Sequence, residues 1–305
     1  MKCDTVHRPA VLAGMLFLVA ALFAGSQCLA AAEPVEIFVS IPPEAYLADR
    51  VGGDHVRVHT LADKGQDPHT FEPAPKQIVD LGHADLYFTM GLPFEHRLLG
   101  KIKSSREKLV VVDISKGITK RLMSADHHGE SSREEEQGHE HGEPDPHIWL
   151  SPPLLKIMAG NIAEALGKAA PEYRSEFQKN LGALDKDINA VNARIKEILK
   201  PFSGQTFLVY HPAFGYFADA YGLHQEAVEL EGKSPTPRHL AQLISEAKAK
   251  HVKIIFVQPQ FDKTSAEAIA DAIGGTVIEM DSLAYNVLGN LQAMADKIEH
   301  SFAAK

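Results

Sequence analysis

The chain has 305 residues, of which 45% are hydrophobic and 23% charged, as in an ordinary soluble globular protein. At roughly 150 residues per domain, this length predicts two domains, each large enough to form its own core. The formal net charge of -9 argues against a nucleic-acid partner, whose phosphates require a basic surface. With 16 His and only 2 Cys, the composition excludes a disulfide scaffold and a zinc finger built on paired cysteines, and the histidine surplus needs an explanation.

Residues 1–32 predict a secretory signal peptide. A basic start precedes an uncharged, mostly apolar run over 10–25, and small residues allow cleavage after Ala30 or Ala32. The run has about 16 residues, whereas a membrane-spanning helix needs about 20. A lipid anchor on Cys28 is the alternative, although the residue before it is not the small one usual at such sites. Because both cysteines lie in this segment, we expect an exported periplasmic protein without thiols, which would bind any metal through nitrogen and oxygen.

Short β-branched runs alternate with helical stretches in two successive sets. The first set of predicted strands comprises residues 35–41, 56–61, 85–90 and 109–114, with helices at 75–82 and 94–104. The second set comprises strands at 206–210, 226–230, 253–258 and 276–280. Strands that alternate with helices predict an α/β fold of two similar lobes, 33–170 and 201–305, each with a four-stranded parallel sheet and flanking helices.

Residues 171–200 predict one long helix between the two lobes, roughly 45 Å in length if helical throughout. Pro171 suits a first helical position and Pro201 a stop. The apolar residues follow a 4, 3, 4, 3 spacing that forms one stripe: Phe177, Leu181, Leu184, Ile188, Val191, Ile195 and Ile198. A coiled-coil partner is the competing interpretation. We expect a rigid spine that packs along both lobes.

The segment 126–145 is acidic, nearly free of apolar residues and contains four histidines: His127, His128, His139 and His141. Such a segment buries too little surface to offset its ordering entropy, so we expect a mobile loop. Its histidines predict weak accessory metal sites. A merely solvated acidic loop is the alternative.

Three other histidines lie in proline-flanked motifs. His69 and His147 each end an Asp-Pro-His tripeptide, and His211 lies in Tyr-His-Pro at the end of the strand predicted at 206–210. Proline restricts its neighbours, so stiff loops present these imidazoles. Ligand sites of open α/β sheets form beyond the carboxyl ends of the strands. We therefore expect the three imidazoles to converge on the cleft between the lobes.

Asp281 ends the last predicted strand and would direct a carboxylate toward the same cleft. Three imidazoles and one carboxylate make a four-coordinate set that suits Zn²⁺ at about 2.0 to 2.2 Å per bond. Taken singly, each residue is weak evidence, because a histidine near a strand end is more often a surface or hydrogen-bonded residue. The histidines that lack such motifs are not predicted to be ligands of this site: His55, His59, His83, His96, His224, His239, His251 and His300.

At these motifs the chain resembles the periplasmic zinc-uptake solute-binding proteins of ABC transporters, the ZnuA type, which are related to manganese-binding members. The resemblance covers essentially the whole chain after the signal peptide. Its most specific parts are Asp67-Pro68-His69 with Glu72-Pro73, the stretch from Asp145 to Pro152, the stretch from Tyr210 to Phe217, and Pro259-Gln260-Phe261. An acidic, histidine-containing loop before the second histidine is also typical of the zinc-type members.

The resemblance implies two α/β lobes joined by one rigid helix, and metal ligands at His69, His147, His211 and Asp281. Manganese-type members usually have glutamate at the third position, so a histidine there favours zinc. Two departures leave the ligands in place, namely Ser282 where many members have proline and Gln258 where an acidic residue is frequent. In some relatives water or another carboxylate takes the fourth place, so Asp281 is the least secure ligand.

By this resemblance the protein is a monomeric receptor that captures Zn²⁺ and delivers it to an ABC-transporter permease, not an enzyme. A manganese or iron receptor of the same family is one alternative. A secreted zinc hydrolase is the alternative from another class, supported by Glu72 and Glu231 but lacking His-Glu-x-x-His. Because neutral imidazole binds the metal, affinity should fall as the pH drops through about 6.5.

Overall fold

The computed structural model describes residues 1, 33–102, 108–123, 143–229, 236–261 and 263–303. Residues 34–305 form one compact unit. Residues 2–32 of the predicted signal peptide lie outside the described residues, as do the four histidines of the acidic segment. Among the described residues, no helix has the length and apolar character needed to cross a membrane.

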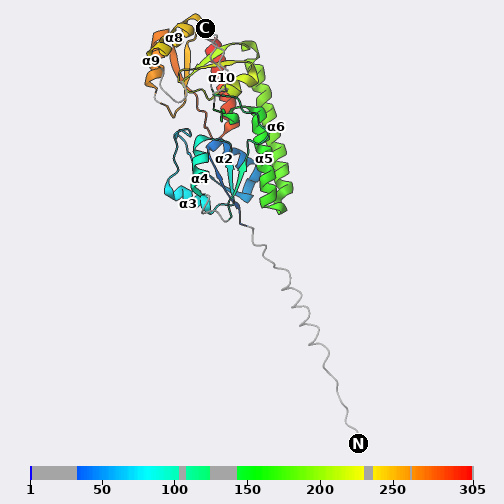
Figure 1. The fold of residues 1–305 in the computed structure, drawn as a ribbon. Coiled ribbons are helices and arrows are strands. Elements are labelled where there is room, and N and C mark those ends of the chain that lie inside the picture. The colour runs from blue at the N-terminus through cyan, green and yellow to red at the C-terminus, as the bar shows by residue number, and fades with distance from the viewer. Residues whose placement is uncertain (2–32, 103–107, 124–142, 230–235, 262, 304–305) are drawn as a thin grey trace, which may run out of the picture. The chain divides into compact units, whose positions relative to one another are not determined.

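The first lobe is built on a four-stranded parallel sheet in the order β2-β1-β3-β4 (Figure 1). Its strands are β1 (Val35–Val39), β2 (Val56–Thr60), β3 (Leu86–Thr89) and β4 (Val110–Asp113). Its helices are α2 (Pro42–Gly52), α3 (Pro75–Gly82) and α4 (Pro93–Ile102), each beginning at a proline, which suits the first helical turn. The strands predicted for this lobe and the helix at 75–82 are confirmed.

The second lobe repeats this topology, with the order β6-β5-β7-β8 and all pairs parallel. Its strands are β5 (Thr206–Val209), β6 (His224–Ala227), β7 (Ile254–Val257) and β8 (Thr276–Glu279). Its helices are α7 (Gly215–Tyr221), α8 (Pro237–Ala249), α9 (Thr264–Ile273) and α10 (Val287–Ala303). The predicted α/β fold with two four-stranded sheets is confirmed. Strand β6 begins two residues earlier than the predicted start at 226, because the polar residues of this edge strand pair with β5.

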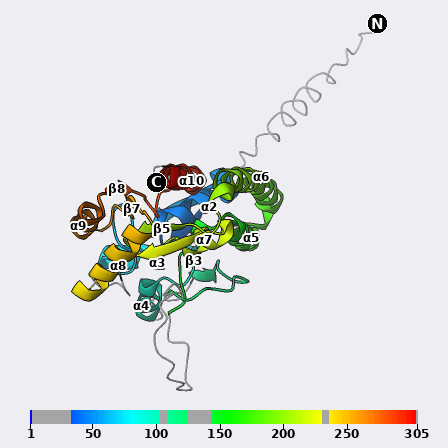
Figure 2. The ribbon, with the colours of Figure 1, turned by 90° about the horizontal axis from the view of Figure 1, so that it is seen from above.

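The second sheet separates two apolar layers, as alternation along a strand requires. Phe207 and Val209 belong to the main core, which extends into the first lobe and includes residues of α6 and α10. Leu208 and Tyr210 point to the other face, where they pack with residues of α8 and α9. Figure 2 shows these two helices on the side of the sheet away from α6. Because apolar layers cover both faces of this sheet, only the loops at the ends of its strands are placed to reach a ligand.

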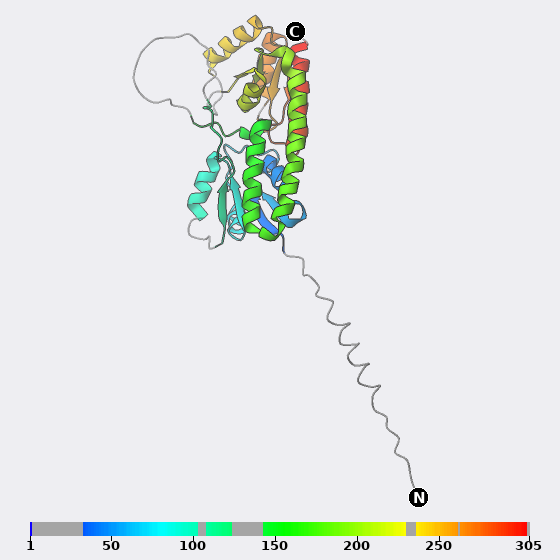
Figure 3. The ribbon, with the colours of Figure 1, turned by 90° about the vertical axis from the view of Figure 1, so that its right-hand side faces the viewer.

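Helix α6 (Arg174–Leu199) lies between two short 3-10 turns, Pro171–Tyr173 and Lys200–Phe202. It contacts α2 and α5 (Pro152–Ala169) of the first lobe and α7 and α10 of the second. Figure 3 shows α6 beside α5 and continuing along the second lobe. The predicted apolar stripe forms its inner face: Phe177, Leu184, Ile188 and Ile195 are buried, and the other members of the stripe, Leu181, Val191 and Ile198, are partly buried against the same core. The predicted spine is confirmed.

Candidate metal centre

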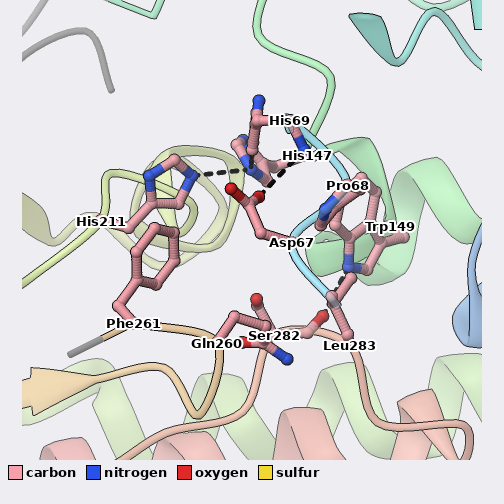
Figure 4. A pocket seen from close by; sticks show the side chains of 10 residues that line it. All are labelled: Asp67, Pro68, His69, His147, Trp149, His211, Gln260, Phe261, Ser282 and Leu283. Atoms are coloured by element: carbon pink, nitrogen blue, oxygen red, sulfur yellow. Dashed lines mark hydrogen bonds between the residues drawn. The ribbon is translucent and has the colours of Figure 1, made fainter. Parts of the chain in front are cut away.

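The three motif histidines meet between the two sheets although they are far apart in the sequence. One potential ligand atom from each of His69, His147 and His211 lies within 4.8 Å of the other two. The Nε2 atom of His147 is 3.2 Å from Nε2 of His69 and 3.3 Å from Nε2 of His211 (Figure 4). The structure thus brings these three imidazoles together with their Nε2 atoms facing one another.

The spacing of these nitrogens matches one coordination sphere. A tetrahedral zinc with Zn–N bonds of about 2.0–2.1 Å holds its ligand atoms about 3.3–3.4 Å apart. The two separations at His147 are 3.2 and 3.3 Å. Two of the three separations therefore match the edges of one coordination tetrahedron, and the ligand atoms of all three histidines lie within 4.8 Å of one another.

His147 is the most firmly held of the three imidazoles. It is 3% exposed, and Oδ1 of the buried Asp145 accepts hydrogen bonds from its backbone N–H at 2.9 Å and from its ring Nδ1 at 2.7 Å. A proton on Nδ1 leaves the lone pair on Nε2, the atom that faces the other imidazoles. The next turn, Ile148–Leu150, is fully buried, and Trp149 donates its indole N–H to the carbonyl of Ser282 in the second lobe at 2.7 Å.

His211 follows β5 and is supported by two buried side chains. Its Nδ1 lies 3.3 and 3.4 Å from the two carboxylate oxygens of Glu229, which follows β6. The Gln258 amide pairs with the His211 backbone: its Oε1 accepts from the His211 N–H at 3.3 Å, and its Nε2 donates to the His211 carbonyl at 2.8 Å. The ring also stacks on Phe261, with centroids 4.9 Å apart. These contacts direct Nε2 of His211 toward His147.

His69 lies on the loop after β2 and is only partly buried. Its backbone N–H donates to Asp67 Oδ1 at 2.9 Å, and the other Asp67 oxygen accepts from the Thr70 hydroxyl. Figure 4 shows the Asp67 carboxylate directed toward the imidazoles. Within the described part of the chain no carboxylate is bonded to the His69 ring, which contacts the rings of His147 and His211 instead.

Burial lowers the pKa of two of the three imidazoles and so favours their neutral form. Desolvation, followed by the proximity of His147 and His211, lowers the pKa of His69 to about 2. Desolvation also lowers the pKa of His147, and the opposing attraction of Asp145 does not offset it. A neutral imidazole carries the lone pair that a metal ion needs. His69 and His147 therefore keep their lone pairs below the ordinary histidine pKa of about 6.5.

Asp281 is placed differently from the three histidines. It follows β8 as predicted, but its carboxylate is not among the described ligand atoms that lie within 4.8 Å of one another. Its Oδ1 accepts from the backbone N–H of Leu283 at 2.8 Å and faces the Gln260 amide nitrogen at 3.5 Å. A change of side-chain rotamer would be needed to bring this carboxylate to the imidazoles.

Sequence reasoning missed the residues that support the ligands. The aspartates of the two Asp-Pro-His motifs were noted in the sequence only as parts of those motifs. Gln258 was noted only as a departure from the family pattern, and none of the three was predicted to support a ligand. Glu229 had no sequence signal beyond its place at the end of a strand. Of the carboxylates considered for a hydrolase, Glu72 is exposed and does not line the pocket, and Glu231 lies outside the described residues.

Solved structures with the same architecture contain metal-binding receptors. A crystal structure of ZnuA is 37% identical, covers 88% of this chain and 99% of that one, and has a TM-score of 0.80. A ZnuA deletion mutant with zinc bound is 38% identical, covers 88% of this chain and 98% of that one, and also has a TM-score of 0.80. These matches extend over both lobes.

Sequence comparison leads to the same family. The zinc-binding protein AdcA of Streptococcus pyogenes serotype M3 is 30% identical over 260 residues, which are 79% of this chain and 48% of AdcA, so this chain spans about half of that relative. The model of the family "Zinc-uptake complex component A periplasmic" matches residues 37–300. Proteins of this family are solute-binding receptors, so the hydrolase alternative is wrong. The chain belongs to the family of periplasmic zinc-uptake complex component A, as its sequence motifs suggested.

Proposed function

We propose that this metal-binding receptor captures one Zn²⁺ per chain in the periplasm, as a monomer, and delivers it to an ABC-transporter permease. His69, His147 and His211 are the proposed ligands. The observation that carries the proposal is the spacing of 3.2 and 3.3 Å between the Nε2 atoms at His147, which matches the edge of a zinc tetrahedron.

Three imidazole donors favour zinc over manganese, which prefers oxygen ligands. Three carboxylates close to the imidazoles supply negative charge to balance a divalent cation: Asp67, Asp145 and Glu229. The relatives named as zinc-binding or solved with zinc bound support the same choice. The second candidate is a manganese or iron receptor. A protein that prefers manganese or iron when either ion competes directly with zinc would support it.

Asp281 is the proposed fourth ligand. Its Oδ1 accepts from the Leu283 N–H, its other oxygen is the one that could bind the metal, and a water molecule can take the fourth position where the carboxylate does not reach it. Four protein ligands or three with water both complete a tetrahedron. The histidines at 127, 128, 139 and 141 are proposed as weak accessory sites on their sequence context alone.

Elemental analysis tests the proposal. Purified protein should carry one tight zinc per chain after dialysis against a weak chelator, and the His211→Ala variant should lose it. His96→Ala is the matched control, because His96 is exposed on α4 and does not line the pocket. A wild-type protein without zinc, or a His211→Ala variant that retains it, would contradict the proposed function. Delivery is tested by zinc uptake into vesicles that contain the cognate permease, with and without the receptor.

A further inference from the structure

A short antiparallel pairing leads into the segment that carries His147. The Asp145 N–H donates to the Arg121 carbonyl at 2.8 Å, and the Met123 N–H donates to the Glu143 carbonyl at 3.1 Å. Leu122 and Pro144 form the bridge between them. This pairing sets the backbone position of Asp145. It therefore also sets the position of the Asp145 carboxylate, which is hydrogen-bonded to the His147 ring.

A tyrosine of the second lobe holds the pairing in place. The buried Tyr216 hydroxyl accepts from the Arg121 N–H at 2.9 Å and donates to the Asp145 carbonyl at 2.9 Å. One oxygen atom thus bridges both strands of the pairing. Because Tyr216 lies in α7 and Asp145 belongs to the first lobe, this contact joins the two lobes directly beside the metal centre.

The Arg121 side chain reinforces the same contact. Its Nη1 is 3.1 Å from Oδ2 of Asp219 in α7, its Nε is 3.8 Å from Oδ2 of Asp145, and its guanidinium lies 6.0 Å from the centre of the Tyr216 ring. Gly215, the first residue of α7, leaves the space that the guanidinium fills, since a Cβ atom there would overlap it. The close approach of Arg121 to α7 therefore requires a glycine at this position.

Helix α7 begins four residues after His211, so one short stretch of chain, 211–216, carries a proposed ligand and the contact that fixes another. We propose that Tyr216 is a positioning residue that fixes His147 through Asp145, with Arg121 holding the contact closed. The assignment rests on the proposed function, because His147 is a proposed zinc ligand. If Tyr216 fixes His147 in this way, the spacing between the imidazoles depends on how α7 packs against the first lobe.

The effect on metal binding follows from the chain of contacts. Loss of the Tyr216 hydroxyl leaves the Asp145 carbonyl and the Arg121 N–H without this partner, so the pairing can shift relative to α7. A shift of Asp145 moves the carboxylate that orients His147. Loss of a group that supports a ligand in this way commonly reduces metal affinity about 10- to 100-fold.

Two variants of the same helix separate this role from general stability. In Tyr216→Phe, zinc affinity measured by chelator competition on the full chain should fall about tenfold or more. Tyr221→Phe is the control from the same helix, because it removes a hydroxyl that makes a partly buried hydrogen bond to Asn192 at 2.9 Å, away from the site. This control should stay within about twofold of wild type, since it leaves every contact of the ligands intact. Equal affinities in Tyr216→Phe and wild type would overturn the proposal.

A readout without metal keeps this test independent of the proposed function. In the metal-free protein, nuclear magnetic resonance follows the exchange of the His147 Nδ1 proton that is bonded to Asp145. Tyr216→Phe should accelerate this exchange, and so should Gly215→Ala, which displaces the Arg121 guanidinium. Tyr221→Phe should not. Unchanged exchange in both site variants would overturn the positioning role, whereas absence of zinc in the wild type would contradict only the proposed function.

Discussion

The tripeptide Asp-Pro-His occurs twice in the chain, and the two copies orient their histidines differently. In both copies Oδ1 of the aspartate accepts the N–H of the histidine two residues later at 2.9 Å, so the local turn is the same. At 145–147 the same oxygen also binds the imidazole, at 2.7 Å, and a buried turn follows. At 67–69 the second aspartate oxygen binds the Thr70 hydroxyl instead, and the residues before it, 63–66, are exposed.

The difference indicates how the two histidines would take part in metal exchange. The protein fixes His147 before a metal arrives, whereas the ring of His69 has no carboxylate partner in the described part of the chain. An imidazole that is already fixed loses little conformational entropy when it binds the ion, which favours affinity. A less restrained imidazole can move to admit or release the ion. We therefore expect His147 to determine affinity and His69 to determine the rate of exchange.

The largest expected effect is that of His147→Ala. Structural zinc sites bind with roughly 10–16 kcal/mol shared among four ligands, so one ligand accounts for about 3 kcal/mol, or about a hundredfold in affinity. His147→Ala should reach this loss, because it removes the nitrogen next to both others. His69→Ala should cost less affinity and increase the dissociation rate. Chelator competition and stopped-flow measurements would show this, and a greater affinity loss in His69→Ala would reverse the comparison.

The next effect comes from exchanging each aspartate for asparagine, which preserves an oxygen for the turn. Asp145→Asn removes the charge that orients His147 and should lower zinc affinity about 10- to 100-fold. Asp67→Asn removes a nearby charge and the acceptor of the Thr70 hydroxyl, but no bond to an imidazole, so we expect a loss below about tenfold. The two variants are matched in chemistry and local structure. Equal losses would show that both carboxylates act through charge alone.

The sequence was sufficient to predict the fold and the convergence of the histidines because these depend on local signals. Apolar runs predict the strands, and a parallel sheet places the residues after β2, like those after β5 in the other lobe, at the carboxyl edge of its sheet, where ligand sites form. The alternating spacing of 4 and 3 between apolar residues in 171–200 predicted the long helix that joins the lobes. Helix α5 was not predicted, because it is apolar on several sides and lacks a clear periodicity.

The supporting contacts could not be predicted because they join distant segments. Glu229 reaches His211 only because β6 pairs with β5, and the placement of β6 two residues too late hid this relation. Gln258 reaches the same histidine from the end of β7. The side-chain position of Asp281 depends on the Leu283 N–H two residues later, a contact that no residue pattern reports.

The metal-free protein should lose stability below about pH 6.5 because of His69. Its pKa is about 2 in the folded protein, so the unfolded chain takes up a proton below its ordinary value of about 6.5 while the folded protein does not. Stability is therefore complete above pH 6.5 and decreases with falling pH, by on the order of 2 kcal/mol at pH 5. Urea unfolding at pH 7.5 and 5 should show a smaller decrease in His69→Gln. An equal decrease in both proteins would exclude His69 as its source.

The smallest expected effect is that of Asp281→Asn. In the structure Oδ1 of the carboxylate accepts from the Leu283 N–H, so turning the carboxylate toward the imidazoles would weaken a hydrogen bond worth about 1.5–3 kcal/mol to a charged acceptor. This cost offsets much of the gain from a fourth ligand, and water can replace the carboxylate. We expect a loss of affinity below about tenfold, clearly less than the roughly hundredfold loss for one imidazole. A loss as large as that of His147→Ala would mean that Asp281 reaches the metal at little cost, and that the second lobe holds the ion as firmly as the first.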